Sequence, residues 1–170
     1  MSILDILIYP DPRLRKKSKP VKKINDSIIE LLENMAETMY NAPGVGLAAP
    51  QVGKNIRVIT IDISSVEDEQ RDLIELINPE IISSKGSQIG EEGCLSVPGF
   101  VSNVKRKMDI KVKSQNREGE TIIYETSDLL SRVMQHEIDH LNGIYFFDRL
   151  ARLKRELLVN KIKKEFVVNK

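Results

Sequence analysis

The sequence predicts an α+β fold, in which antiparallel or mixed β-sheets pack around a central buried helix, with an N-terminal helix and a C-terminal helix beside them. Three observations support this fold class. A helical period covers residues 25–41, strand-like segments occupy much of residues 56–126, and helical patterns return at residues 128–142 and 151–170. Strands grouped together between helices are typical of α+β proteins. The length indicates a single domain over residues 1–170, large enough to bury a core.

The composition is that of an ordinary soluble globular protein, with 41% hydrophobic and 30% charged residues. A net charge of +1 gives no overall attraction to nucleic acid or membrane, and no apolar run approaches the ~20 residues that span a bilayer. Residues 1–9 lack a basic segment, and Asp5 interrupts their apolar run, which argues against a signal peptide. The single cysteine, Cys94, suits a reducing compartment. We therefore expect a cytoplasmic location, with no membrane partner and no specific DNA binding.

The first predicted helix covers residues 25–41. Apolar side chains recur there with a period near 3.6 residues, at Ile28, Ile29, Leu32, Met35, Ala36, Met39 and Tyr40. Residues 25–27 supply suitable N-caps, and the Pro-Gly pair at 43–44 ends the pattern. The two prolines in residues 9–17 indicate an extended or turn-like start, and the basic residues there a solvated surface.

Residues 44–53 are uncharged and mostly small, with glycines at positions 44, 46 and 53. Glycine allows positive φ angles and close approach of another backbone, so this segment is either a buried connector or a substrate-binding loop. A strand is predicted over residues 56–63, followed by an acidic polar loop over residues 64–71. A second strand region covers residues 73–82, with a break at the Asn-Pro pair at 78–79.

Glycines punctuate residues 90–99, and we expect an irregular segment there that presents Cys94. Two strands follow, over residues 101–114 and 120–126, joined by a hairpin turn at residues 116–119. The next helix has Ser127 and Asp128 as candidate N-caps and Gly143 as its end. Its apolar residues lie on more than one side, at Leu129, Leu130, Val133, Met134, Ile138 and Leu141, so the helix should be largely buried.

This helix contains both histidines of the chain, His136 and His140, with Glu137 between them. Residues four apart share a helix face, so two imidazoles can bind one metal ion. Glu137 lies about 100° around the helix from His136 and borders the metal without ligating it. This arrangement suits a general base that acts on metal-bound water. The alternative is a pair of surface histidines that have this spacing by chance, which two randomly placed histidines rarely do.

A metal site of this kind needs a third protein ligand. One possibility is a downstream glutamate, Glu156 or Glu165, as in many metallopeptidases, but both lie in a lysine-rich helical pattern and are typical of solvated ion pairs. The other is the Cys94 thiolate, which leaves the fourth position to water. Cys94 is favoured because it is the only soft ligand besides the histidines. From the ligand types alone, zinc would be expected.

The chain resembles the bacterial peptide deformylases, which remove the formyl group from new N-terminal formylmethionine. All three motifs of that family occur in order, as Gly44-Val45-Gly46-Leu47-Ala48-Ala49-Pro50-Gln51, Glu92-Gly93-Cys94-Leu95-Ser96 and Gln135-His136-Glu137-Ile138-Asp139-His140-Leu141. The resemblance covers nearly the whole chain. It implies hydrolysis of the N-formyl group with release of formate, in the class of formyl-L-methionyl peptide amidohydrolases.

The resemblance also implies roles for individual residues. It implies that Cys94, His136 and His140 bind the metal, that Glu137 is the general acid/base, and that Gln51 and the Leu95 backbone N–H bind the developing oxyanion. The expected ion is Fe²⁺, with Zn²⁺, Ni²⁺ or Co²⁺ as alternatives in purified protein. The expected substrate-binding residues are Val45, Gly46, Leu47, Glu92, Gly93, Leu129 and Val133. Two alternatives are open for Arg106. It either pairs with Glu92 and braces the segment that holds Cys94, or it lies on the surface.

Residues 151–170 predict a basic amphipathic helix, with Leu153, Leu157, Val159 and Ile162 as its apolar positions. Seven basic and two acidic residues give it a net charge of 7 − 2 = +5. The resemblance implies that this helix docks on the ribosome near the nascent-chain exit, where N-formylmethionyl peptides emerge. Two other functions remain open at this point. One is a zinc metallopeptidase of the HExxH class, and the other is a ribosome-associated binding module with a structural metal.

Overall fold

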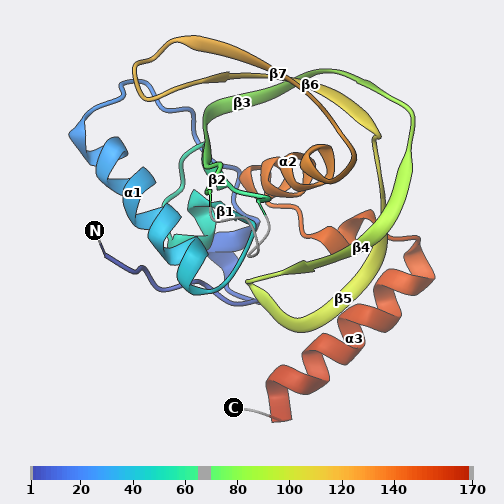
Figure 1. Cartoon of the computed structure of the whole chain (residues 1–170). Helices are drawn as coiled ribbons and strands as arrows, with labels where there is room; N and C mark the ends of the chain where they lie inside the picture. Colours follow the sequence, from blue (N-terminus) through green and yellow to red (C-terminus); the bar gives the residue numbers. More distant parts are fainter. Residues whose placement is uncertain (1, 65–69, 169–170) are drawn as a thin grey trace.

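The structure, a computed structural model, describes residues 2–64 and 70–168. Figure 1 shows helix α2 in the middle of the molecule, with the strands passing around it and α1 and α3 on the outside. In chain order the elements are η1 (Pro12–Arg15), α1 (Asp26–Asn41), β1 (Gly46–Ala48), η2 (Ala49–Val52), β2 (Val58–Ile61), β3 (Ile74–Lys85), β4 (Gln88–Cys94), β5 (Val97–Arg106), β6 (Asp109–Gln115), β7 (Thr121–Ser127), α2 (Asp128–Leu141), η3 (Phe146–Arg149) and α3 (Arg152–Val168).

The strands form two separate sheets. Five strands pair in the order β1-β2-β3-β6-β7, and β4 pairs with β5 alone. Every strand pair is antiparallel. The α+β prediction is therefore confirmed, including the helix at each end and the buried helix between the sheets.

Helix α1 forms where the periodicity predicts it. Its N-cap is Asn25, whose side chain accepts a hydrogen bond from the Ile28 N–H at 3.2 Å. Its buried face, which includes Met35 and Met39, packs in one apolar cluster with Leu47 of β1 and residues of β2 and β3. This packing places β1, and with it the glycine-rich segment, next to α1 at one end of the large sheet.

Helix α2 is the core element, since every residue from Ser131 to Leu141 is buried. Its apolar side chains pack on β1, β2, β3 and β6 in a cluster with Ile59, Leu76 and Val112. Ser127 occupies the N-cap position without a capping hydrogen bond from its side chain. Gly143 ends the helix as predicted, at φ +72°, and a Cβ there would lie 2.3 Å from the Arg15 carbonyl oxygen.

The region from residue 88 to residue 114 differs from its prediction in two ways. The segment expected to be irregular is a β-hairpin, in which Cys94 ends β4 and Val97 begins β5. The strand expected over residues 101–114 is two strands in different sheets, separated at residues 107–108. The sequence alternation continues across this break. At this break the Lys107 N–H donates to the Gln135 Oε1 of α2, and the Lys107 carbonyl accepts from the Gln135 Nε2.

The break predicted at residues 78–79 is a bulge inside β3. Asn78 has φ +53°, and the pairing with β6 shifts register between Ile77 and Glu80. Of the acidic loop expected over residues 64–71, residues 65–69 lie outside the described part of the chain.

Helix α3 confirms the predicted C-terminal helix through Val168; Lys170 lies outside the described residues. Two of its four predicted apolar positions, Val159 and Ile162, are buried against β5 and η3. The other two, Leu153 and Leu157, are 68% and 57% exposed. Within the described ranges, no helix is long and apolar enough to cross a membrane.

Candidate metal centre

Three side chains with metal-binding atoms meet between the β4-β5 hairpin and α2. Cys94 comes from the end of β4, and His136 and His140 come from successive turns of α2. Their ligand atoms all lie within 4.8 Å of one another, and the Cys94 Sγ is 3.2 Å from the His140 Nε2. One thiolate and two imidazoles suit a tetrahedral metal that keeps its fourth position for water or substrate. The residues present therefore fit a catalytic metal site.

Glu137 borders this cluster and is 4% exposed. Its Oε1 lies 3.9 Å from the His136 Nε2, and its Oε2 is buried with no hydrogen-bond partner among the described residues. Burial raises the pKa of Glu137 to about 7. A buried carboxylate with a free oxygen and a pKa near neutrality can both accept and donate a proton.

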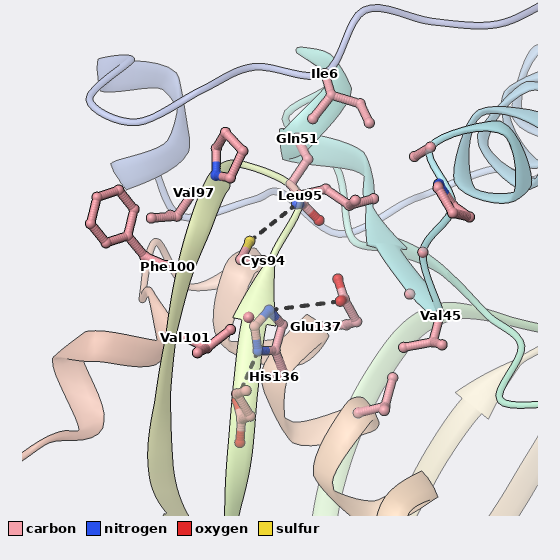
Figure 2. Close-up of a pocket in the computed structure, with 18 of the residues that line it drawn as sticks. Ile6, Val45, Gln51, Cys94, Leu95, Val97, Phe100, Val101, His136 and Glu137 are labelled. Carbon is pink, nitrogen blue, oxygen red and sulfur yellow. Dashed lines mark hydrogen bonds and ion pairs between the residues drawn. The ribbon is translucent and has the colours of Figure 1, made fainter. Parts of the chain in front are cut away.

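Glu92 of β4 orients His136. Its Oε1 is 2.9 Å from the His136 Nδ1, which leaves the Nε2 on the side of Glu137 (Figure 2) and available to a metal ion. Burial would raise the pKa of Glu92, but hydrogen bonds from Arg106 and His136 outweigh it and lower the pKa to about 2. Burial likewise opposes the charged form of His136, but hydrogen bonds with Cys94 and Glu92 raise its pKa to about 10. A carboxylate behind a ligand histidine fixes the ring and increases its basicity toward a metal.

The predicted pairing of Glu92 with Arg106 is confirmed. Arg106 is only 5% exposed, so the alternative of a surface role for it is wrong. Its Nε and Nη2 donate to the Glu92 carboxylate at 2.9 and 2.8 Å, and its Nη1 donates to the Asp139 Oδ2 at 2.6 Å. Asp139 also accepts two hydrogen bonds from Arg149. Sequence reasoning missed Asp139 and Arg149, although a charged residue three positions after His136 in a buried helix was a usable signal.

Gln51 lies in η2, on the opposite side of Cys94 from His136 (Figure 2). Its Oε1 accepts from the Ala48 N–H at 2.9 Å, which fixes the direction of the side-chain amide. Its Nε2 donates to the Ser96 Oγ at 3.1 Å and lies 3.6 Å from the Cys94 Sγ. Leu95 forms the turn of the β4-β5 hairpin directly after the cysteine. Gln51 and Leu95 therefore come from different elements and both lie next to Cys94 (Figure 2).

A cavity of about 870 Å³ opens onto Cys94, His136 and Glu137. Among the predicted substrate-binding residues, those that line it are Val45, Gly46, Glu92, Gly93, Leu129 and Val133. Leu47 does not line it, because its side chain is fully buried against α1. The walls also include residues that sequence reasoning missed, namely Ile6, Phe100, Val101 and Arg132. Figure 2 shows Ile6, Val45 and Val101 around the space in front of Glu137.

A comparison with known protein families matches residues 3–156 to the polypeptide deformylases. The chain belongs to this family. It is accordingly an enzyme, a metal-dependent deformylase that hydrolyses the N-formyl group of N-terminal formylmethionine in newly synthesised proteins. This assignment sets aside the HExxH peptidase and the non-enzymatic binding module.

Curated deformylases align with nearly the full length of the chain. The peptide deformylase of Thermodesulfovibrio yellowstonii is 52% identical over 163 residues, which cover 96% of this chain and 98% of that protein. The peptide deformylase of Desulfotalea psychrophila is 46% identical over 98% of this chain and 99% of its own length.

Solved deformylase structures share the fold described above. The Legionella pneumophila enzyme superimposes with a TM-score of 0.89 at 45% identity, covering 99% of this chain and 98% of that one. The Ehrlichia chaffeensis deformylase, solved in complex with actinonin, gives a TM-score of 0.88 at 37% identity, covering 97% of this chain and 98% of its own.

Proposed function

We propose that Cys94, His136 and His140 are the metal ligands of this deformylase and that Glu137 is its general acid/base. The observation that carries the proposal is the convergence of the three ligand atoms beside the cavity, which Cys94 and His136 line. Next to them lies a buried carboxylate oxygen with no hydrogen-bond partner among the described residues. Glu156, the rival third ligand, lies on α3 and pairs with Arg152 at 3.3 Å. A divalent metal held there lowers the pKa of water and polarises the formyl carbonyl.

Glu137 handles the proton in this mechanism. Its carboxylate accepts a proton from the attacking water and then donates that proton to the leaving amine nitrogen, as the bond between that nitrogen and the formyl carbon breaks. A group whose pKa is close to neutral is suited to both steps. The products are formate and a peptide with a free N-terminus.

The Gln51 amide and the Leu95 backbone N–H stabilise the oxygen that becomes negative in the transition state. Gln51 is held by its hydrogen bond from Ala48, so its Nε2 can change partner from Ser96 to substrate without moving the whole side chain. Loss of one such donor typically lowers the rate by about 10²–10³.

The methionine side chain occupies the cavity between Val45, Leu129 and Val133. The peptide backbone extends along β1, which pairs with β2 on one side and is the end strand of its sheet. An extended peptide adds to such an edge through main-chain hydrogen bonds. Gly46 and Leu47 take part through their backbone atoms, and Glu92 and Gly93 form the opposite wall.

The resident ion in this proposal is Fe²⁺, with Zn²⁺, Ni²⁺ or Co²⁺ able to occupy the same ligands. The whole chain, residues 1–170, acts as one catalytic domain in the cytoplasm, where formylated nascent chains are made. The deciding experiment is formate release from formyl-Met-Ala by protein purified without oxygen, with metal analysis of the same sample. One bound metal and rapid release support the proposal; release that is unaffected by complete metal removal contradicts it.

Actinonin is a useful probe of the cavity. The Ehrlichia chaffeensis relative forms a complex with it, and we expect this chain to bind it in the cavity beside Glu137. Protection of formyl-Met-Ala from hydrolysis by stoichiometric actinonin is the expected result. Binding that leaves hydrolysis unchanged would place the ligand elsewhere.

We further propose that the basic helix α3 docks on the ribosome near the nascent-chain exit. Lys161, Lys163 and Lys164 are exposed, while Val159 and Ile162 hold the helix on the body of the protein. Deleting the tail would uncover this core, so a triple Lys→Ser variant is the better test. Reduced cosedimentation with ribosomes, with unchanged hydrolysis of formyl-Met-Ala, is expected. Equal cosedimentation of both proteins would exclude docking through these charges.

A further inference from the structure

The face of α2 that meets the β4-β5 hairpin is polar, although the rest of the helix is packed with apolar side chains. Arg132, His136 and Asp139 occupy successive turns of this face, and all three are at least nine-tenths buried. The hairpin presents Glu92 and Arg106 to them. Each charge on one element thus meets an opposite charge or a hydrogen-bonding partner on the other.

Among the described residues, the apolar side chains of the hairpin and those of α2 belong to different clusters. The apolar side chains of α2 belong to the cluster that fills the space under the five-stranded sheet. The apolar side chains of the hairpin, including Val97 and Val104, belong to a second cluster with η3 and α3. The hairpin also shares no strand pairing with the large sheet. The polar contacts are therefore the direct link between the hairpin and α2, and they act together with the packing of the hairpin on η3, which follows α2 in the chain.

Arg132 makes the largest number of these contacts. Its Nη1 donates to the carbonyl of Gly90 on β4 at 3.2 Å, to the carbonyl of Val104 on β5 at 2.9 Å, and to the Glu92 Oε2 at 2.6 Å. Its Nη2 donates to the Gln88 Oε1 at 3.2 Å. Gly90 and Val104 are paired residues of the hairpin, so the guanidinium spans both strands at one level.

Gly90 is the partner that this arrangement requires. A Cβ at position 90 would lie 3.0 Å from the Arg132 Nη2 and 3.1 Å from its Cζ, closer than ordinary van der Waals contact. The absence of a side chain lets the guanidinium lie flat on the strand backbone. The glycine in the middle of β4 is explained by this contact.

We propose that Arg132 is a positioning residue that sets the spacing between the cysteine-bearing hairpin and α2. The inference rests on the proposed ligand set of Cys94, His136 and His140. Two properties follow from the spacing. One is the fit of the three ligand atoms to the metal. The other is the width of the cavity between α2, which supplies Leu129 and Val133, and the hairpin, which supplies Glu92 and Gly93.

The chemistry of arginine suits this role. Its planar fork binds a carboxylate and two carbonyls at once, whereas a lysine ammonium is a point charge on a flexible stem. Buried ion pairs of this kind add little net stability compared with apolar replacements, and their best-established use is to fix the register of packed elements. Arg132 also lines the cavity, so a displacement of its guanidinium is felt directly at the substrate.

The test compares Arg132→Met and Arg132→Lys with the parent enzyme. Arg117→Met is the matched control, because Arg117 pairs with Glu75 at 2.6 Å and lies outside the cavity lining. Metal affinity is measured by competition with a chelator. The thiolate-to-metal absorption band is recorded after the protein is loaded with Co²⁺. The kinetic constants kcat and KM are measured with formyl-Met-Ala and with formyl-Leu-Ala.

For Arg132→Met we expect metal affinity to fall by about 10–100-fold, the usual effect of losing a partner behind the ligands. The Co²⁺ absorption band should shift. At saturating metal, the KM for formyl-Met-Ala should rise by a larger factor than kcat falls. The ratio of kcat/KM for formyl-Met-Ala to that for formyl-Leu-Ala should decrease. Arg132→Lys should recover only part of each loss, and Arg117→Met should change none of them. A folded Arg132→Met protein with the metal affinity, Co²⁺ band and KM of the parent overturns the inference.

A second comparison separates positioning from a general loss of folding. Gly90→Ala keeps the arginine but pushes its guanidinium away, so it should weaken metal binding in the parent and add no further loss in Arg132→Met. Equal effects of Gly90→Ala in both backgrounds would show that Arg132 does not set the spacing. Failure of the proposed ligand set is recognised separately, because Cys94→Ala would then leave the metal affinity of the parent sequence unchanged.

Discussion

Gly46 is the position at which a single added methyl group should disturb the reaction without touching a metal ligand. A Cβ there would lie 2.7 Å from the Glu137 Oε1 and 2.9 Å from its Cγ. Ordinary contact begins near 3.4 Å, so the carboxyl group must move by about 3.4 − 2.7 = 0.7 Å. The strand cannot retreat easily, because Gly46 is buried and paired with Ile61 of β2.

The size of the effect follows from this displacement. A misplacement of about 1 Å in a catalytic group can cost about 10²-fold in rate. For Gly46→Ala we therefore expect kcat to fall by about 10- to 100-fold, equivalent to about 1.4–2.7 kcal/mol in activation free energy. Metal content should stay at the level of the parent, because the three atoms nearest to the added Cβ all belong to Glu137 and none to a proposed metal ligand.

The assay is formate release from formyl-Met-Ala, with metal analysis and the melting temperature recorded for each variant. Glu137→Ala and the double variant, which carries both Gly46→Ala and Glu137→Ala, complete a double-mutant cycle. If the methyl group acts through Glu137, the double variant should be no slower than Glu137→Ala alone. A Gly46→Ala enzyme with the kcat of the parent, or a further large loss in the double variant, would refute this reasoning.

Three other predictions concern Glu137, Cys94 and Asp148. Glu137→Ala should keep its metal and lose about 10²–10⁴-fold in turnover, the usual contribution of acid–base catalysis; near-normal turnover by fully loaded protein would remove Glu137 from the mechanism. Cys94→Ala should lose or severely weaken metal binding after dialysis against a chelator, whereas Glu156→Ala should not, and the opposite pattern would move the site to the His₂Glu class. Burial would raise the pKa of Asp148, but its hydrogen bonds, chiefly from Arg15, outweigh this and lower it. The stabilisation is therefore present above the ordinary aspartate pKa of about 3.9 and is lost as the pH falls through the lower folded value. Asp148→Asn should accordingly lower the melting temperature at pH 7. The difference in melting temperature between the variant and the parent should decrease as the pH falls below about 4. A difference that is constant from pH 7 to pH 3 would show that the Asp148 carboxylate does not supply this stabilisation.

Local patterns in the sequence were sufficient for the helices and for part of the site. The 3.6-residue period placed α1 and α2 within a residue or two of their observed ends. The two histidines share a face of α2 because their four-residue spacing is a property of any α-helix. Glu137 lies beside them for the same reason. These features depend on neighbours in the chain, so the sequence alone determines them.

The strand boundaries around the hairpin required the tertiary structure. The alternation of side chains runs on from β5 into β6, yet the two strands lie in different sheets. The bend between them lies at Lys107, whose backbone binds the side chain of Gln135 on α2, 28 positions further along the chain. Contacts of this range leave no periodic signal in the segment that bends.

The burial of charge was also decided by tertiary contacts. Cys94 and His140 are 46 residues apart and meet only because the hairpin is held against α2. The sequence left Arg106 open between a pair with Glu92 and a surface position, and it did not single out Arg132. In the structure both guanidinium groups are buried beside Glu92, and Arg106 also pairs with Asp139. The free energy of a buried charge depends on its partner, and that partner comes from another element. The sequence alone therefore determined which residues could bind the metal, and the tertiary structure decided what brings them together.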